Sequence, residues 1–393
     1  MHDIVIIAAR RTPIGSFQGA LAEAPAPHLA ATANRAVLEE SGLDPAEIDE
    51  VTFGCVLPAG IGQAPARQGA LAAGIPASVP CTTVNKMCGS GMKTIMYGFD
   101  RIAAGSADIV LAGGMESMTN APYLLPKARG GMRLGHQHVI DHMFYDGLQD
   151  PYSDQMMGFF AEATADKYGF TREEQDAFSI ESVKRATHAT ESGAFSNEIA
   201  PVTIETRRGQ KVVEQDEEPG RCDIAKIPTM RPAFRTDGGT VTAASSSSIA
   251  DGAAAVLLTS AEEAERRGLQ PIARIITHSS FAQEPEWFTT APIGAIQALH
   301  EKLGWTPEDV DLYEINEAFA VVTMAAMQDL GLDHGKVNVN GGACALGHPI
   351  GATGARITTT LIHGLQQRGG KRGIASLCIG GGEATGLAIE LIN

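Results

Sequence analysis

The chain has 393 residues, of which 44% are hydrophobic, so it is long enough for two ordinary domains or for one assembly of repeated halves. This composition excludes a disordered protein. The formal net charge is −16, whereas general binders of nucleic acid or membrane surfaces need basic faces. We therefore expect neither as a partner, and any anionic ligand must meet a local basic cluster.

Cysteine usage and the chain ends bear on the cellular compartment. The six cysteines show no paired CxxC spacing, which indicates free thiols in a reducing compartment. The first residues are already strand-like, with no signal-peptide pattern, and the last three are not a peroxisomal tripeptide. No apolar run approaches the roughly 20 residues of a membrane span. We expect a cytoplasmic protein.

The first part of the chain alternates strand and helix patterns. Residues 4–7 and 109–112 are apolar and β-branched, and residues 29–38 have helical spacing of apolar positions. This alternation predicts an α/β fold with a parallel sheet. Residues 81–84 are predicted to form a short buried strand.

Cys88 lies just after that strand, in a glycine-framed turn where a helical pattern begins. Met92, Ile95, Met96 and Ile102 follow at helical spacing. A thiolate at a helix N-terminus meets unpaired N–H groups and the positive end of the helix dipole, so we expect a lowered pKa. Cys88 is the candidate nucleophile, although an inert buried cysteine is an equally common interpretation of such a residue.

Two segments of the first half are repeated in the second. Residues 42–49 and the strand after them resemble residues 304–311 and their following strand, with a helix end, a turn and a strand in each. The Cys88 turn, its helix and the strand at 109–112 correspond to residues 351–354, a helix through 365 and a strand at 374–377. Duplication predicts a pseudo-twofold molecule in which loops of both halves meet at one site.

Between the copies, the composition shifts to glycine, proline and charge, which predicts an inserted loop domain over residues 118–244. A helix with a capping box is expected at residues 172–192. The N-terminal half would then comprise residues 1–117 plus 245–270, and the C-terminal half residues 271–393. Basic residues gather in the later part of the insertion, and they could form either a solvated surface or a phosphate-binding rim. They are Arg207, Arg208, Lys211, Arg221, Lys226, Arg231 and Arg235.

Three loops of the second half carry candidate catalytic groups. Asn316 follows a strand and could orient a water, or cap the next helix. His348 lies in a glycine-rich, non-helical loop at residues 341–351 and could act as a base. Cys378 is a second reactive thiol, and the glycines from Gly380 onward free backbone N–H groups to hold an oxyanion. Together with Cys88 these groups suit acyl chemistry.

Other motifs are weaker. His136, His138 and His142 have a spacing that could suit zinc, but the surrounding loop is poor in ligands, so we expect no metal site. The serine run at residues 245–248 lacks a Gly-x-Ser-x-Gly frame and is interpreted as a ligand-contacting segment.

These four loops, in this order and across nearly the whole chain, resemble those of the thiolases. They read Asn-Lys-Met-Cys88-Gly-Ser-Gly, Asn316-Glu-Ala-Phe, Gly-His348-Pro and Cys378-Ile-Gly-Gly-Gly. The resemblance implies two βαβαβαββ halves in a five-layer α/β/α/β/α arrangement, an insertion that covers coenzyme A, and a homotetramer built from tight dimers.

The resemblance also implies roles. Cys88 would take the acyl group, His348 would accept its proton, and Cys378 would remove the α-proton of a second acetyl-CoA. The enolate would be held by His348 and a water on Asn316, and the second oxyanion by the N–H groups of Cys88 and Gly380. Substrate and coenzyme A contacts are expected from Ser247, Arg221, Met157, Phe234, Ala318 and Phe319.

The implied reaction is the reversible condensation of two acetyl-CoA into acetoacetyl-CoA and coenzyme A, with coenzyme A thioesters as substrates and no permanently bound cofactor. The sequence departs from the short-chain pattern at Met156, Phe159 and Phe288, and these departures leave the identity of the acyl chain undecided. A degradative 3-ketoacyl-CoA thiolase of broader chain length is therefore the near alternative. A non-catalytic acyl-CoA or lipid binder would have lost one of the four loops. A ketoacyl synthase would lack Cys378.

Overall fold

The computed structural model describes residues 3–207 and 209–392. Its main sheet follows the order β12-β13-β14-β11-β1-β10-β5-β3-β4, with the short β2 paired to β10. The strands are β1 (Ile4–Arg11), β2 (Gly15–Ser16), β3 (Glu50–Gly54), β4 (Cys81–Val84), β5 (Ile109–Ser117), β10 (Ala250–Ser260), β11 (Ala273–Ala282), β12 (Leu312–Ile315), β13 (Arg372–Ile379) and β14 (Glu383–Leu391).

The sheet consists of two halves with the same strand order. If the strands of the N-terminal half are numbered in chain order without β2, they lie in the order third, second, fourth, fifth, first from the edge of the sheet inward. The C-terminal half has the same order, but its third strand is reduced to a bridge between Tyr313 and Val337. The first strands of both halves join them, with Ile4 opposite Ile275. This symmetry confirms the predicted duplication. The predicted parallel pairing holds for β3, β4 and β5, whereas β10 is antiparallel to both β5 and β1.

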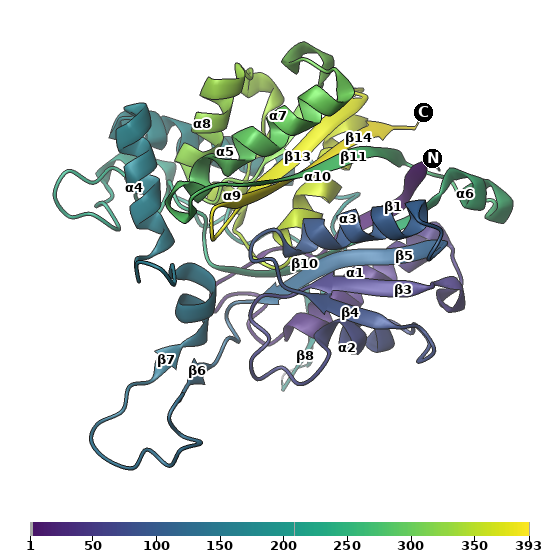
Figure 1. Ribbon diagram of the computed structural model, residues 1–393, viewed down its shortest axis with the longest axis horizontal. Coiled ribbons are helices and arrows are strands. Elements are labelled where there is room, and N and C mark those ends of the chain that lie inside the picture. The colour runs from purple at the N-terminus through teal and green to yellow at the C-terminus, as the bar shows by residue number, and fades with distance from the viewer. Residues whose placement is uncertain (1–2, 208, 393) are drawn as a thin grey trace.

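Helices complete five layers. In Figure 1, α3 and α10 lie between the lower, N-terminal half of the sheet and the upper, C-terminal half, while α1 and α2 cover the outer face of the first half and α7 and α8 that of the second. The helices of the two halves are α1 (Ala26–Ser41), α2 (Pro65–Ala72), α3 (Ser90–Ala103), α6 (Ala261–Arg267), α7 (Ala291–Leu303), α8 (Ala320–Leu330), α9 (Ala343–Leu346) and α10 (Thr353–Arg368).

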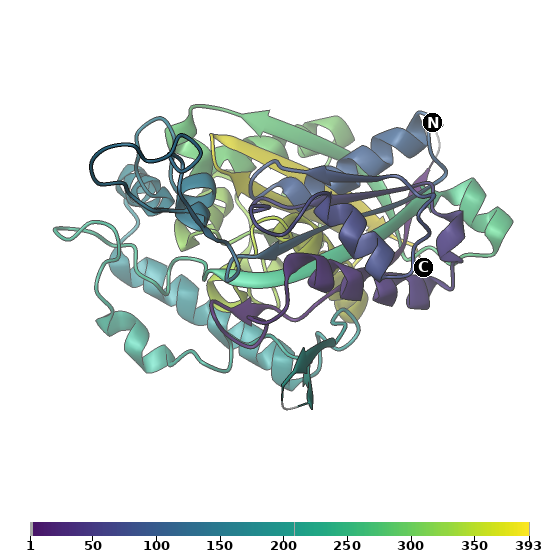
Figure 2. The same cartoon turned by 90° about the horizontal axis from the view of Figure 1, so that it is seen from below.

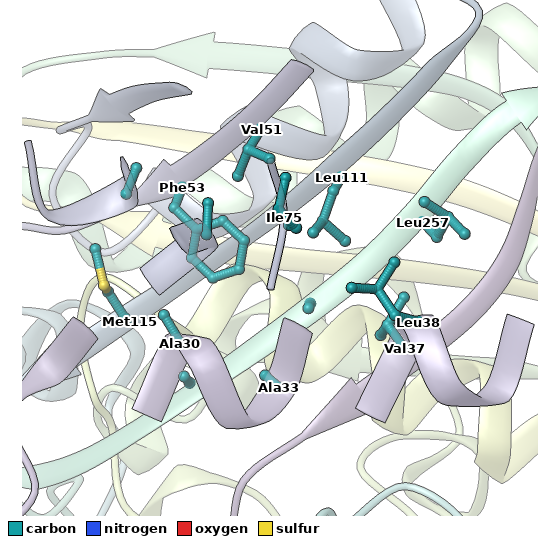
Figure 3. Packing of buried hydrophobic residues seen from close by; sticks show 14 of the residues in the cluster. Ala30, Ala33, Val37, Leu38, Val51, Phe53, Ile75, Leu111, Met115 and Leu257 are labelled. Carbon is teal, nitrogen blue, oxygen red and sulfur yellow. The ribbon is translucent and has the colours of Figure 1, made fainter. Parts of the chain in front are cut away.

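The apolar face of α1 explains its position. Ala30, Ala33, Val37 and Leu38 pack on side chains from β3, β5 and β10, among them Phe53 (Figure 3). All are buried, so their removal from water stabilises the layer at about 25 cal/mol per Å² of apolar surface. Small alanines at the contact let helix and sheet approach closely.

The repeated segments have the same local structure. Gly42 ends α1 with φ = 66°, and Gly304 ends α7 with φ = 64°, a left-handed conformation that favours glycine. A short 3-10 turn and a strand follow each glycine: η1 (Pro45–Glu47) with β3, and η5 (Pro307–Asp309) with β12. One prediction is wrong: β4 is not buried, because it is the edge strand of the sheet and its residues are half-buried or exposed.

The segment between β5 and β10 includes two further helices and two hairpins. The helix α5 has the predicted capping box at Thr171, and α4 was not predicted. Figures 1 and 2 place α4 and the long β6–β7 loop at the opposite side of the molecule from the chain ends. The elements are β6 (Tyr123–Leu124), β7 (Ile140–Asp141), η2 (Phe144–Leu148), α4 (Met157–Tyr168), α5 (Arg172–Glu191), β8 (Val202–Thr206), β9 (Gly209–Val213) and η3 (Ile224–Thr229).

The remaining short turns are η4 (Pro285–Thr290) and η6 (His334–Lys336). Among residues 3–207 and 209–392, no helix combines the length and the apolar character needed to cross a membrane.

Candidate active site

A cavity of about 210 Å³ opens beside the Cys88 turn, between loops of the two halves and the insertion. Its walls are mostly apolar. Eight of the predicted site residues line it: Cys88, His348, Gly380, Met157, Phe234, Ser247, Ala318 and Phe319. The structure therefore brings together in space groups that are up to 292 positions apart in the sequence, between Cys88 and Gly380.

Cys88 occupies the turn between β4 and α3. The hydroxyl of Ser90 donates to the carbonyl of Met87 (2.6 Å) and accepts from the N–H of Lys86 (2.9 Å), so a side chain of the first helical turn fixes the loop. Met87 itself has φ = 47°, a strained conformation for a residue with a side chain. The turn thus holds Cys88 against the cavity.

The expected low pKa of Cys88 is wrong. Burial raises the pKa of its thiol to about 11, with a smaller contribution from the charge of Glu116. The backbone N–H groups of Gly380 and Cys88 face the sulfur and lower the pKa, but burial outweighs them. The same two N–H groups are the pair expected to hold an oxyanion.

His348 is buried and neutral. Burial and then the charge of Arg356 lower its pKa to about 3. Its Nδ1 lies 2.6 Å from Oγ1 of Thr353, whose hydroxyl donates to the carbonyl of Pro349 at 3.0 Å. A hydroxyl has only one proton, so Nδ1 must donate to Oγ1, which leaves Nε2 as the acceptor. Nε2 has no protein partner among the described residues.

Asn316 and Cys378 lie buried behind the lining rather than on it. The Nδ2 atom of Asn316 also lacks a partner in the described chain, whereas its Oδ1 faces Arg356. Asn316 is not a helix cap, because the N-cap of α8 is Phe319. Cys378 lies near the end of β13, and burial, followed by the neighbouring Cys88, raises its pKa well above the ordinary value.

The serine run connects the Asn316 loop and the His348 loop. The N–H of Ser247 donates to Ala318 (2.9 Å), the N–H of Ala320 to Ser245 (2.8 Å), and the N–H of His348 to Ser248 (2.9 Å). These backbone bonds give the run a structural role. They also hold Ser247 at the cavity wall.

Arg221 lies at a wider opening that shares Ser247 and Phe234 with the cavity. Its guanidinium is exposed and contacts Glu217 at 3.2 Å. Two other basic residues of the segment are also paired, Lys226 with Asp223 and Arg235 with Asp166. Arg208 lies outside the described residues. Among residues 118–207 and 209–244, Arg221 is the basic residue that lines this opening.

Two of the three substitutions expected to affect the pocket lie in its wall. Phe288 is buried and contacts the ring of Phe160 edge-on, and Met156 lines the cavity. Phe159 instead packs against Phe234 and is half-exposed. The bulk of Phe288 and Met156 therefore limits the space near Cys88.

Several cavity residues carry no sequence signal, because apolar side chains in loops have no distinctive chemistry. They are Met118, Phe144, Leu148, Ile249 and Ile350. Glu116 was also missed: its buried carboxylate accepts from Val56, Leu57 and Gly351, and so joins the two halves near His348. The loop expected to be irregular before His348 includes the short helix α9.

No group of three metal-ligating side chains occurs within residues 3–207 and 209–392. His136 and His138 are exposed, whereas the Nδ1 of His142 pairs with Asp146 at 2.5 Å.

A neutral thiol, a neutral imidazole and a second thiol beside paired backbone N–H groups can form and resolve a thioester. The fold and the site indicate an acyltransferase on a duplicated α/β scaffold.

Comparisons with known proteins identify the family. Residues 4–262 match the thiolase N-terminal domain and residues 269–391 the thiolase C-terminal domain. The chain is 48% identical to an acetyl-CoA acetyltransferase of Pseudomonas aeruginosa over 391 residues, with 99% of both proteins covered. It is 50% identical to acetyl-CoA acetyltransferase 2 of Arabidopsis thaliana, covering 100% of this chain and 98% of the relative. The chain belongs to the thiolase family.

Solved structures agree. An acetyl-CoA acetyltransferase of Bacillus anthracis superposes with a TM-score of 0.97 at 44% identity, covering 100% of this chain and 99% of that one. The Acat5 thiolase of Ascaris suum, in complex with coenzyme A, gives 0.94 at 43% identity, covering 99% of this chain and 100% of that one. The predicted resemblance and fold are confirmed.

Proposed function

We propose that the protein catalyses the reversible condensation of two acetyl-CoA molecules into acetoacetyl-CoA and coenzyme A, through an acetyl group on Cys88. The observation that carries this proposal is the small apolar cavity into which Cys88, His348 and Gly380 converge. The relatives named as acetyl-CoA acetyltransferases, each matching nearly its full length, support the choice of acetyl-CoA.

In the first half-reaction, Cys88 Sγ attacks the thioester carbonyl while His348 Nε2 accepts the thiol proton. The C–S bond to coenzyme A breaks, and the departing thiolate takes the proton of Cys378. This leaves acetylated Cys88, a protonated His348 and a Cys378 thiolate. The tautomer fixed by Thr353 supports the role of Nε2 as proton acceptor.

In the second half-reaction, the Cys378 thiolate removes the α-proton of a second acetyl-CoA. The enolate oxygen accepts from Nε2–H of His348 and from a water on Asn316 Nδ2, and the carbanion attacks the acetyl group. The N–H groups of Cys88 and Gly380 hold the tetrahedral oxyanion, and such a donor contributes roughly 3 kcal/mol to lowering the barrier. Cys88 leaves as a thiolate and regains its proton from His348.

Coenzyme A would extend from the cavity past Ser247 and Phe234 toward Arg221. The shared opening supports this path, and the exposed guanidinium of Arg221 suits the phosphate-bearing nucleotide end. Met157, Ala318 and Phe319 would contact the reacting end, because they line the cavity itself. No permanently bound cofactor is required.

We further propose a cytoplasmic homotetramer, a dimer of tight dimers, that acts in fatty acid metabolism. The half-exposed edge strand β4 and the protruding β6–β7 loop, where Leu134 is 91% exposed, support association. Light scattering on the purified protein and fractionation of cells check the two parts.

Initial-rate thiolysis of acetoacetyl-CoA and of 3-ketodecanoyl-CoA tests the chain length. We expect a higher kcat/KM for acetoacetyl-CoA, because Phe288 and Met156 fill the space beside Cys88. A strong preference for the longer chain would establish the degradative alternative. No turnover of either substrate would support a non-catalytic acyl-CoA binder.

A further inference from the structure

Arg356 is a buried cation behind the active site. It lies in the first turn of α10, three residues after Thr353, and only 2% of its surface is exposed. Its Nη1 approaches Glu314 at 3.7 Å, and its Nη2 approaches Oδ1 of Asn316 at 3.5 Å. Both Nε and Nη1 lack a hydrogen-bond partner in the described chain. A buried arginine so incompletely paired is costly for stability, which points to another use.

The guanidinium determines how the Asn316 amide is turned. A guanidinium only donates hydrogen bonds, so the amide oxygen must face it and Nδ2 must point to the other side. This orientation leaves Nδ2 buried without a protein partner, ready to donate to a water or to substrate. With an apolar side chain at position 356, the amide would lose this constraint and could turn over.

The same cation acts on His348. Apart from burial, the charge of Arg356 is the cause that lowers the pKa of His348 to about 3. Glu314 compensates this charge weakly, because burial raises its pKa to about 8 even though Arg356 opposes that change. A neutral His348 is the form that can accept the Cys88 proton.

We propose that Arg356 is a positioning residue for the reaction: it fixes the Asn316 amide with Nδ2 turned toward the reacting groups. This inference rests on the proposed function.

Other titratable groups surround His348 as well. Cys88 faces it from the turn before α3, Cys378 lies behind the cavity on β13, and Glu116 binds the N–H of Gly351 from the end of β5. Burial raises the pKa of Glu116 to about 7, so Glu116 titrates close to neutrality. All three groups remain in the variants below, and differences between variants therefore report Arg356.

The test measures thiolysis of acetoacetyl-CoA from pH 5 to pH 9 in the wild type, Arg356→Met and Arg356→Lys. In Arg356→Met we expect kcat to fall at least about tenfold with little change in KM, because Asn316 acts on the transition state. We also expect a new acid limb in kcat/KM, because the pKa of His348 rises once the cation is gone. Arg356→Lys retains the positive charge but loses the planar guanidinium that faces Asn316, so we expect kcat to fall without a new acid limb in the pH profile.

Thr360→Val is the matched control. Thr360 lies one turn further along α10, is equally buried, and donates to Glu198 at 3.2 Å. In the described part of the chain its hydroxyl makes no hydrogen bond to Asn316 or His348. It can lower stability, but its pH profile stays that of the wild type. If Arg356→Met does not fold, Arg356→Lys carries the test, and an unchanged kcat there overturns the proposal. A pH profile and kcat of Arg356→Met equal to those of Thr360→Val would also overturn it. An inactive wild type would instead reject the proposed function.

Discussion

At the scale of single residues, the site pairs a neutral thiol with a neutral imidazole. Burial raises the pKa of Cys88 and lowers that of His348, so charge separation between them is disfavoured before substrate binds. In the proposed mechanism, the proton of Cys88 therefore moves only when a carbonyl is present to accept the sulfur. This differs from a preformed thiolate–imidazolium pair, which would react with any electrophile.

Alkylation of Cys88 by iodoacetamide tests the charge state. Because the pKa of Cys88 is raised to about 11, its thiolate fraction, and with it the alkylation rate, rises with pH across the whole range from 6 to 10. Peptide mass spectrometry separates Cys88 from the other cysteines. A rate that reaches a plateau below pH 8 would show a preformed thiolate and contradict this description.

The convergence of Cys88, His348 and Gly380 on one site could be predicted from the sequence, whereas the ionisation of the two side chains could not. The helix N-terminus that would lower the pKa of Cys88 is visible in the pattern after this residue. The burial that raises the pKa is not visible, because it depends on how much of the chain from elsewhere covers the thiol. Arg356 gave one visible signal, a lone charge in a stretch of helix that has no other charged residue before Arg368. Its contacts with Asn316 become apparent only when α10 is placed against β12.

At the scale of elements, duplication places the N-terminal turns of α3 and α10 against each other. Gly91 and Gly354, which are equivalent in the two repeats, make this contact possible. A Cβ at Gly91 would lie 2.9 Å from the nitrogen of Ala355, and one at Gly354 would overlap the backbone nitrogen of Met92. The positive ends of both helix dipoles are therefore close to Cys88 and His348.

Substitution of Gly354 tests this contact. We expect Gly354→Ala to destabilise the protein by about 1–3 kcal/mol, because the added methyl forces α3 and α10 apart. Gly364→Ala on the same helix is the control: its Cβ would lie 3.5 Å from Leu312 Cδ1, and the better helix former stabilises by up to about 1 kcal/mol. Urea denaturation compares them. Equal effects of the two substitutions would show that the contact imposes no constraint.

At the scale of the whole molecule, the symmetric sheet brings loops of both halves to one edge. The segment between β5 and β10 then covers that edge and contributes Met156, Met157 and Phe234 to the cavity. The repeat, visible in residues 42–49 and 304–311, was sufficient to predict two equivalent halves. The antiparallel direction of β10 was not predicted, because apolar runs alone do not give strand direction. The helix α4 was not predicted, because its apolar and polar residues are hardly separated onto different faces.

The central claim is that Cys88 carries the acyl group while Cys378 works on the second substrate. The most direct measurement is to incubate the wild type, Cys88→Ala and Cys378→Ala with acetyl-CoA, quench with acid and locate acetyl groups by peptide mass spectrometry. We predict acetylated Cys88 in the wild type, and acetylated Cys88 without acetoacetyl-CoA formation in Cys378→Ala. Cys88→Ala should carry no acetylated cysteine. Acetyl on Cys378 with Cys88 unmodified, or normal turnover by Cys88→Ala, would contradict the claim.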